Sequence, residues 1–360
     1  MKKRILSLAA AACMLTGCSA AEKLFGNPDY EPPVEVTPFE KAEITNYFEE
    51  EKDKLWYQQL RQELISLNLE PVLDERVGSS ELRLTFDELR TDCPEVFWYS
   101  GYSMHPKGNT IRIEVSVIDS LKEDELPGMY DELKAAAQEI IDQIPAGSSD
   151  YDKVLFVHDY IADHCEYDYG FNHEETHGLW FTSYGALVDH KAVCSGYAEG
   201  FQYIMNLLGI KGGVCSGYSY QGGSHAWNYV VLDGKNYWVD VTWDDTDNGP
   251  TQHTYFMFDD EQMLRTRWLD GGQNYAPDCI SQDLNWFVKN NAYFTEYNED
   301  AISAITGANG GKCEVMFSDF ETYKEALDSL LGRRHLFKLD GVSGTVTYDR
   351  DDRMYVFRII

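Results

Sequence analysis

The stretch Val193-Cys-Ser-Gly-Tyr-Ala198 opens the segment that decides the fold. Apolar residues recur after it at helical spacing, and Gly209 stands where a C-terminal cap is expected. They are Tyr197, Phe201, Ile204, Met205 and Leu208. The pattern predicts a helix with Cys194 in its first turn. A helix N-terminus lowers the pKa of a thiol, so this position suits a thiolate nucleophile, although a buried structural cysteine gives the same pattern.

A second stretch, Gly222–Asp244, predicts a β-hairpin, because two β-rich runs flank Asp233-Gly234, a pair typical of type I′ turns. This turn pairs Leu232 with Lys235. In that register, Asp240 lies diagonal to His225 on the same face of the sheet. An imidazole beside a carboxylate is the pair that orients a general base toward a cysteine nucleophile. A lone histidine on a strand is more often structural, so the prediction depends on all three residues occurring together.

These blocks resemble a known family. Val193–Ala198, His225–Asn228 and Asp240–Asp244 are similar to the three signature blocks of the transglutaminase-like superfamily, a circularly rearranged relative of papain-type cysteine peptidases. The blocks lie within residues 184–245, and a weaker likeness covers roughly 150–260. The resemblance implies an α+β fold with a papain-like core, in which the helix that bears the cysteine packs on an antiparallel sheet.

The resemblance also implies roles for three residues. Cys194 would be the nucleophile, His225 the general base and acid, and Asp240 the residue that orients His225. It implies no cofactor, and we expect no metal site. Members of the superfamily include acyl transferases, peptidases and inactive binding proteins, so the reaction stays open.

The N-terminus resembles that of an exported lipoprotein. Lys2-Lys-Arg4 precedes the apolar run Ile5–Leu15, which is too short to span a membrane and predicts a signal peptide. Leu15-Thr-Gly-Cys18 resembles a lipobox, where cleavage before Cys18 exposes a thiol for lipid attachment. We therefore expect anchoring to the cell membrane on its extracytoplasmic side. A plain secretory signal is the alternative.

The composition of the chain limits the classes of molecule that we expect it to bind. The formal net charge of −31 argues against nucleic acid, and 43% hydrophobic residues are ample for a packed core. We expect a protein or peptide substrate, on the cell surface or in the cell wall. The acidic surface would attract basic substrates, but solubility explains it equally well. The remaining cysteines show no CxxC pair and no zinc spacing, so we expect scattered buried thiols. They are Cys93, Cys165, Cys215, Cys279 and Cys313.

Five segments are predicted along the chain. They are a signal peptide (1–17), the lipidated Cys18 with a proline-containing spacer (18–38), an N-terminal α/β domain (39–146), the transglutaminase-like catalytic core (147–285) and a C-terminal α+β module (286–360). Within them, periodicity predicts helices over 39–69, 124–144, 151–165 and 320–331. It predicts strands over 111–117, 335–339, 344–348 and 354–360.

Further side chains are candidates for the surroundings of the site. Aromatic residues could wall a substrate groove, although core packing would use the same residues. They are Trp180, Tyr184, Tyr218, Trp227 and Trp243. The acidic run Asp244–Gly249 misses the EF-hand spacing and predicts a solvated loop. His158 and His164 lack a metal-type partner at i+4 and are interpreted as structural.

Together these features predict a lipid-anchored cysteine enzyme that forms a thioester at an amide. Water would resolve the thioester in a peptidase or amidase, and an amine would resolve it in a transglutaminase. An open groove favours water. The rival hypothesis is a non-catalytic surface module that uses the same fold for binding or assembly.

Overall fold

The computed structural model describes residues 13–15, 27, 29–42, 44, 54–74, 77–170, 177–246, 249–271 and 275–360. The chain forms two compact units, one made of residues 40–282 and the other of residues 1–39 and 283–360. Cys18 and most of the predicted leader and spacer lie outside the described residues. In the described part, no helix combines the length and apolarity needed to span a bilayer.

A five-stranded sheet forms the centre of the larger unit, in the order β10-β9-β8-β7-β11 with antiparallel pairs throughout. Its strands are β7 (Gly212–Ser219), β8 (Ser224–Leu232), β9 (Lys235–Val239), β10 (Phe256–Phe258) and β11 (Arg267–Leu269). The predicted hairpin is confirmed, because Leu232 pairs with Lys235. Asp233 and Gly234 have φ values of 52° and 76°, as a type I′ turn requires.

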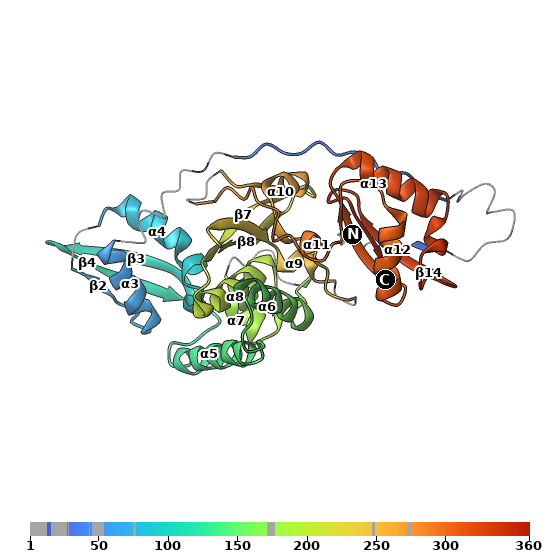
Figure 1. The fold of residues 1–360 in the computed structure, drawn as a ribbon. Coiled ribbons are helices and arrows are strands. Elements are labelled where there is room, and N and C mark those ends of the chain that lie inside the picture. The colour runs from blue at the N-terminus through green and yellow to red at the C-terminus, as the bar shows by residue number, and fades with distance from the viewer. Residues whose placement is uncertain are drawn as a thin grey trace, which may run out of the picture. The chain divides into compact units, whose positions relative to one another are not determined.

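Helices cover one side of this sheet. Figure 1 shows α5 (Leu126–Asp142), α6 (Asp150–His164), α7 (Ser183–Leu187) and α8 (Cys194–Leu208) gathered there. α8 contacts β7 and β8 directly, as the predicted helix should. It ends at Gly209, whose φ of 70° is the left-handed cap expected from the sequence. Tyr197, Phe201 and Met205 on its apolar face are fully buried, and each stabilises the fold by roughly 1.5–3 kcal/mol.

Shorter elements complete this part of the unit. A parallel pair, β5 (Glu166–Tyr167) and β6 (Lys191–Ala192), leads into α8. One-turn helix α9 (Val241–Asp244) follows β9, and α10 (Asp260–Thr266) leads into β11. The antiparallel sheet with the cysteine-bearing helix packed on it confirms the predicted α+β class with a papain-like core.

The beginning of the same unit is a small α/β segment. It contains α3 (Leu55–Ile65), α4 (Ser79–Asp92) and a sheet of β2 (Val72–Leu73), β4 (Thr110–Val117) and β3 (Tyr99–Lys107). The helix expected over 39–69 is wrong at its start, because residues 39–42 and 44 are not helical. The division of residues 39–285 into two domains stays a prediction.

The other unit is a second α+β arrangement. Its sheet has the order β1-β14-β15-β13-β12, with β1 (Cys13–Leu15), β12 (Tyr293–Phe294), β13 (Cys313–Phe317), β14 (Val346–Asp351) and β15 (Val356–Ile359). Its helices are α11 (Trp286–Lys289), α12 (Glu299–Ala308) and α13 (Phe320–Leu327). The strand expected over 335–339 is wrong: His335–Lys338 form a 3₁₀ helix that follows Arg334, whose φ is 62°.

Candidate active site

Cys194 is the first residue of α8, and its side chain is half-buried. The five cysteines expected to be buried thiols are free and buried: Cys93, Cys165, Cys215, Cys279 and Cys313. Gly196, one turn into the helix, lets α8 approach the backbone before it, because a Cβ there would lie 2.7 Å from the carbonyl oxygen of Trp180 and 2.7 Å from the Ala192 Cβ. The helix N-terminus is therefore held tightly against the segment that precedes it.

His225 and Asp240 meet as the hairpin register predicts. His225 lies near the start of β8, and Asp240 follows β9 as the N-cap of α9. The Nε2 atom of His225 lies 2.6 Å from Oδ2 of Asp240, and the two residues are 6% and 1% exposed. Asp240 Oδ1 accepts a hydrogen bond from the Trp243 backbone N–H at 3.3 Å. Both carboxylate oxygens of Asp240 thus have a hydrogen-bond partner. The second ring nitrogen of His225, Nδ1, is the one that does not contact Asp240.

Charge and burial set the ionisation of this pair. Burial lowers the pKa of His225, but the Asp240 charge, its hydrogen bond and the Cys194 side chain raise that pKa to about 8. Burial raises the pKa of Asp240, but His225 and Arg267 lower it to about 2. At neutral pH the arrangement therefore favours an imidazolium between a carboxylate and a cysteine.

Arg267 is a site residue that the sequence did not reveal. It lies in β11, is fully buried, and its Nη1 donates to the same Oδ2 of Asp240 that His225 contacts. Aromatic rings surround its guanidinium, with the Trp243 ring centroid at 3.8 Å and the Tyr255 centroid at 5.0 Å. The only sequence signal is a charged residue directly before the apolar pair Trp268-Leu269. Nothing in that segment indicates its partner.

Tyr167 is another neighbour that the sequence did not single out. It lies in β5 and pairs with Ala192, two residues before Cys194. Burial raises its pKa, and the Cys194 and Asp240 charges raise it further. Its phenol therefore stays neutral beside the thiol.

The five predicted groove residues divide by exposure. Tyr218 is 40% exposed and stacks on Trp268. Trp180 and Trp243 are partly exposed, and Trp243 stacks on His225 at 4.8 Å between centroids. Tyr184 and Trp227 are 6% and 1% exposed, so they pack in the core and do not fit the expectation of a groove wall.

The acidic loop differs from expectation at Asp244. Asp244 is fully buried, accepts a hydrogen bond from the Tyr255 N–H and lies 3.2 Å from Nε2 of His158. The prediction of a solvated loop is therefore wrong for Asp244, because its carboxylate joins α9 to α6. His158 itself is fully buried.

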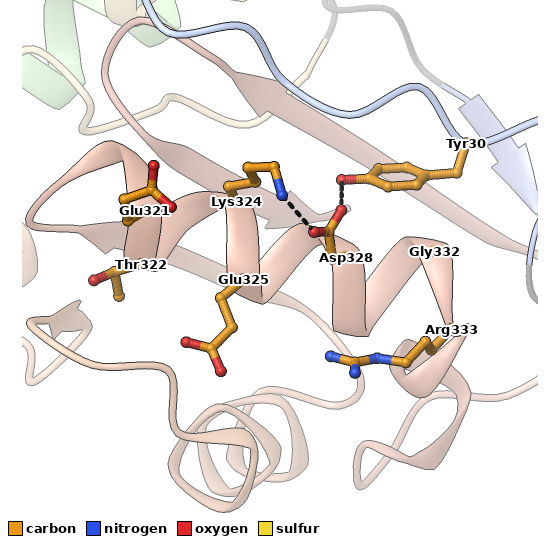
Figure 2. Close-up of a pocket in the computed structure, with 8 residues that line it drawn as sticks. All are labelled: Tyr30, Glu321, Thr322, Lys324, Glu325, Asp328, Gly332 and Arg333. Carbon is orange, nitrogen blue, oxygen red and sulfur yellow. Dashed lines mark hydrogen bonds and ion pairs between the residues drawn. The ribbon is translucent and has the colours of Figure 1, made fainter.

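The other unit contains a pocket, whose lining residues are distant from Cys194 in sequence. The pocket is lined by Tyr30, by Gly332, and by side chains of α13 and of the turn that follows α13. Figure 2 shows the charged groups of these residues around the pocket. Tyr30 and Lys324 both bond to Asp328, at 3.0 Å and 2.9 Å. The lining contains no cysteine or histidine.

Comparisons with known proteins agree with this geometry. Residues 135–243 match the model of the transglutaminase-like superfamily, a range that contains Cys194, His225 and Asp240. The chain is 30% identical over 192 residues to the Kyphoscoliosis peptidase of Homo sapiens. The matched region covers 48% of this chain and 29% of that protein. The chain thus spans less than a third of that relative.

Two solved structures are similar to part of the chain. One is a TGase crystal structure, 19% identical, with a TM-score of 0.29 over 49% of this chain and 51% of that one. The other is the periplasmic domain of TgpA from Pseudomonas aeruginosa, 17% identical, with a TM-score of 0.25 over 37% of this chain and 55% of that one.

The fold and the matched segment define a mixed α+β protein with a papain-like core. The middle of the chain, residues 135–243, is similar to the transglutaminase-like superfamily.

Proposed function

We propose that this domain is a cysteine enzyme that forms a thioester at an amide of a protein or peptide substrate. The observation that carries the proposal is the 2.6 Å contact between His225 and Asp240, next to a cysteine at the first position of α8. An oriented imidazole beside a half-buried thiol is the arrangement that activates a cysteine nucleophile. The match to the transglutaminase-like model over these residues supports it.

In the first half of the proposed reaction, the Cys194 thiolate attacks the amide carbonyl carbon. The Cys194 backbone N–H, at the helix N-terminus, donates to the oxyanion that develops. His225 gives its proton to the nitrogen of the leaving amine as the C–N bond breaks, which leaves an acyl thioester and a neutral imidazole. Asp240 holds Nε2 throughout, so that Nδ1 keeps facing the sulfur.

In the second half, His225 takes a proton from water as the oxygen attacks the thioester, and the proton returns to the sulfur. An amine would follow the same course and give a new amide. We favour hydrolysis, because transfer to an amine requires a site that excludes water, and two of the five aromatic candidates are buried in the core. The peptidase name of the human relative supports the same choice.

We also propose that the chain is lipid-anchored at Cys18 and faces the extracytoplasmic side. The support is the sequence alone, through Leu15-Thr-Gly-Cys18 after a charged and apolar leader. Cys18→Ala should abolish incorporation of a labelled fatty acid, while Cys93→Ala, a matched change elsewhere, should leave it intact. Equal labelling of the wild type and Cys18→Ala would remove this part of the proposal.

The test of the chemistry is thiol labelling of the folded protein with iodoacetamide at mildly acidic pH, followed by peptide mapping. Cys194 should alkylate at least roughly tenfold faster than Cys279, because Cys194 is half-buried beside a general base, whereas Cys279 is buried. His225→Ala should remove most of that advantage. Cys279→Ala is the control and should leave it unchanged.

Turnover distinguishes the two resolving nucleophiles. Glutamine-containing and cell-wall-type peptides are incubated with and without a labelled primary amine and analysed by mass spectrometry. We expect free acids to dominate and Cys194→Ala to form none. Dominant amine adducts would instead make the protein a transglutaminase in activity. If Cys194 is no more reactive than Cys279 and no product forms, the chain is a binding or assembly module.

A further inference from the structure

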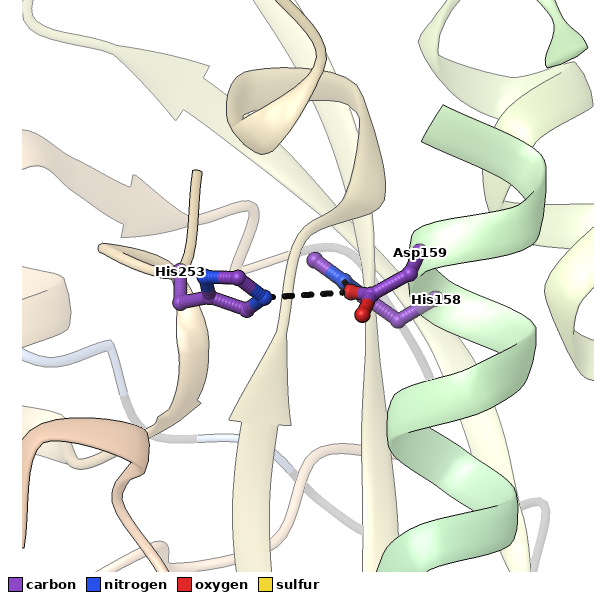
Figure 3. A group of neighbouring side chains, drawn as sticks. All are labelled: His158, Asp159 and His253. Carbon is purple, nitrogen blue, oxygen red and sulfur yellow. Dashed lines mark hydrogen bonds and ion pairs between the residues drawn. The ribbon is translucent and has the colours of Figure 1, made fainter. Parts of the chain in front are cut away.

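A cluster of two histidines and a carboxylate lies outside the candidate active site. His158 and Asp159 are neighbours on α6, and His253 precedes β10 (Figure 3). Oδ1 of Asp159 lies 2.8 Å from Nδ1 of His158 and 3.2 Å from Nε2 of His253. All three ligand atoms lie within 4.8 Å of one another. No role in the proposed reaction uses these residues.

We propose that His158, Asp159 and His253 form a binding site for a divalent metal ion of the Zn²⁺ class. Two imidazole nitrogens and one carboxylate oxygen are a ligand set that Zn²⁺ commonly takes, with a fourth position left for water. Ligand atoms around a tetrahedral Zn²⁺ lie about 3.4 Å apart, given bonds of roughly 2.0–2.1 Å. The contacts of 2.8 Å and 3.2 Å are already close to that spacing, and the two imidazole nitrogens lie within 4.8 Å of each other.

Each ring nitrogen of His158 faces a carboxylate oxygen, Nδ1 that of Asp159 and Nε2 that of Asp244. Its Nε2 faces Oδ2 of buried Asp244 at 3.2 Å, so Nε2 carries a proton and donates. In the neutral imidazole, Nδ1 then presents a lone pair toward the Asp159 oxygen at 2.8 Å. Two acceptors at that distance need a positive centre between them, which is either a second proton or a metal ion.

The surroundings of His158 are those of a metal ligand. A ligating histidine usually donates its other ring N–H to a carboxylate, which fixes the tautomer and the orientation of the ring. Asp244 fills that role, and the Tyr255 N–H holds Asp244 in turn, at 3.0 Å and 3.1 Å from its two oxygens. The Asp159 and His253 side chains are 37% and 15% exposed, so an ion can enter from their side.

The position of the cluster gives the ion a structural role. It would join α6 to the segment before β10, and through Asp244 it would brace the last residue of α9. The N-cap of that one-turn helix is Asp240, which holds His225. The metal site therefore supports the segment that carries the orienting carboxylate, without contacting it.

The test measures metal binding directly and needs no substrate. Full-length protein carrying Cys194→Ala, which removes a competing thiolate, is stripped with a chelator and titrated with Zn²⁺ against a chromophoric competitor. His253→Gln and Asp159→Asn are added in this background. His164→Gln is the control, because His164 lies on the same helix but bonds to the carbonyl of Tyr160. Circular dichroism verifies that each variant is folded.

We expect one equivalent of Zn²⁺ in the parent and in His164→Gln. Affinity should fall at least 100-fold in His253→Gln and Asp159→Asn, and about 10- to 100-fold in Asp244→Asn, which removes the supporting carboxylate. The Co²⁺-loaded parent should show the visible absorption of a tetrahedral ion. If the folded parent binds no metal, or binds it as tightly in His253→Gln, a proton fills the cluster and the proposal is wrong.

Discussion

The buried pair of Arg267 and Asp240 allows a quantitative test by paired substitutions. Both side chains are fully buried, and Arg267 packs against the rings of Trp243 and Tyr255. Asp240→Asn leaves the guanidinium charged and without its carboxylate in a site with no exposed surface. Breaking a buried pair from one side costs roughly 3–5 kcal/mol of unfolding free energy.

The reverse change should cost less. Arg267→Met keeps an apolar stem against the same rings, and Asp240 retains His225 as a partner, so we expect a loss of about 1–3 kcal/mol. The double variant has neither buried charge. Because it leaves neither of these two charges buried without its partner, it should be more stable than the sum of the single variants predicts, by about 2 kcal/mol or more.

Urea unfolding of the wild type, both single variants and the double variant at pH 7 measures these values, with equal m-values as the check that unfolding stays two-state. Additivity within about 0.5 kcal/mol would refute the reasoning, because it would mean that the two groups do not depend on each other. So would an Asp240→Asn variant as stable as the wild type.

Two further predictions concern pH. The kcat/KM for amide cleavage should fall on the alkaline side with an apparent pKa of about 8, because His225 must carry a proton to protonate the leaving amine. Arg267→Met removes a neighbouring cation and should move this alkaline limb to higher pH. A shift of the limb to lower pH would contradict the assignment. Burial raises the pKa of Glu199 on α8 to about 7, although Arg90 opposes the rise. The folded state therefore loses stability as pH rises from the unfolded pKa through about 7, and Glu199→Gln should be nearly neutral at about pH 4 but stabilising by about 3 kcal/mol at about pH 8. Urea midpoints at both pH values test this, and a less stable variant at pH 8 would mean that the Arg90 pair outweighs burial.

The parts of the fold that were predictable from the sequence are those fixed by local chemistry. The helix from Cys194 follows from apolar periodicity and the Gly209 cap, and the contact between His225 and Asp240 follows from a two-residue turn whose length sets the register. In each case the decisive residues lie within one or two neighbouring elements.

The parts that were not predictable depend on distant segments. Arg267 reaches Asp240 from a strand at the far edge of the sheet, and His253 meets His158 from a loop beyond the hairpin. The burial of Tyr184 likewise follows from its hydrogen bond to Glu132 of α5, which its own segment does not indicate. The spacing of residues along the chain does not predict such contacts.

The buried cysteines can serve as native probes of local unfolding in this protein. Cys93, Cys165, Cys215 and Cys279 are at most 4% exposed in the larger unit, and Cys313 is 6% exposed in the other. A dilute thiol reagent can reach these sulfurs only when the surrounding structure opens, so each modification rate measures the free energy of a regional fluctuation. With Cys194 replaced, native cysteines would therefore map which regions open together and which open alone, without any probe added to the chain.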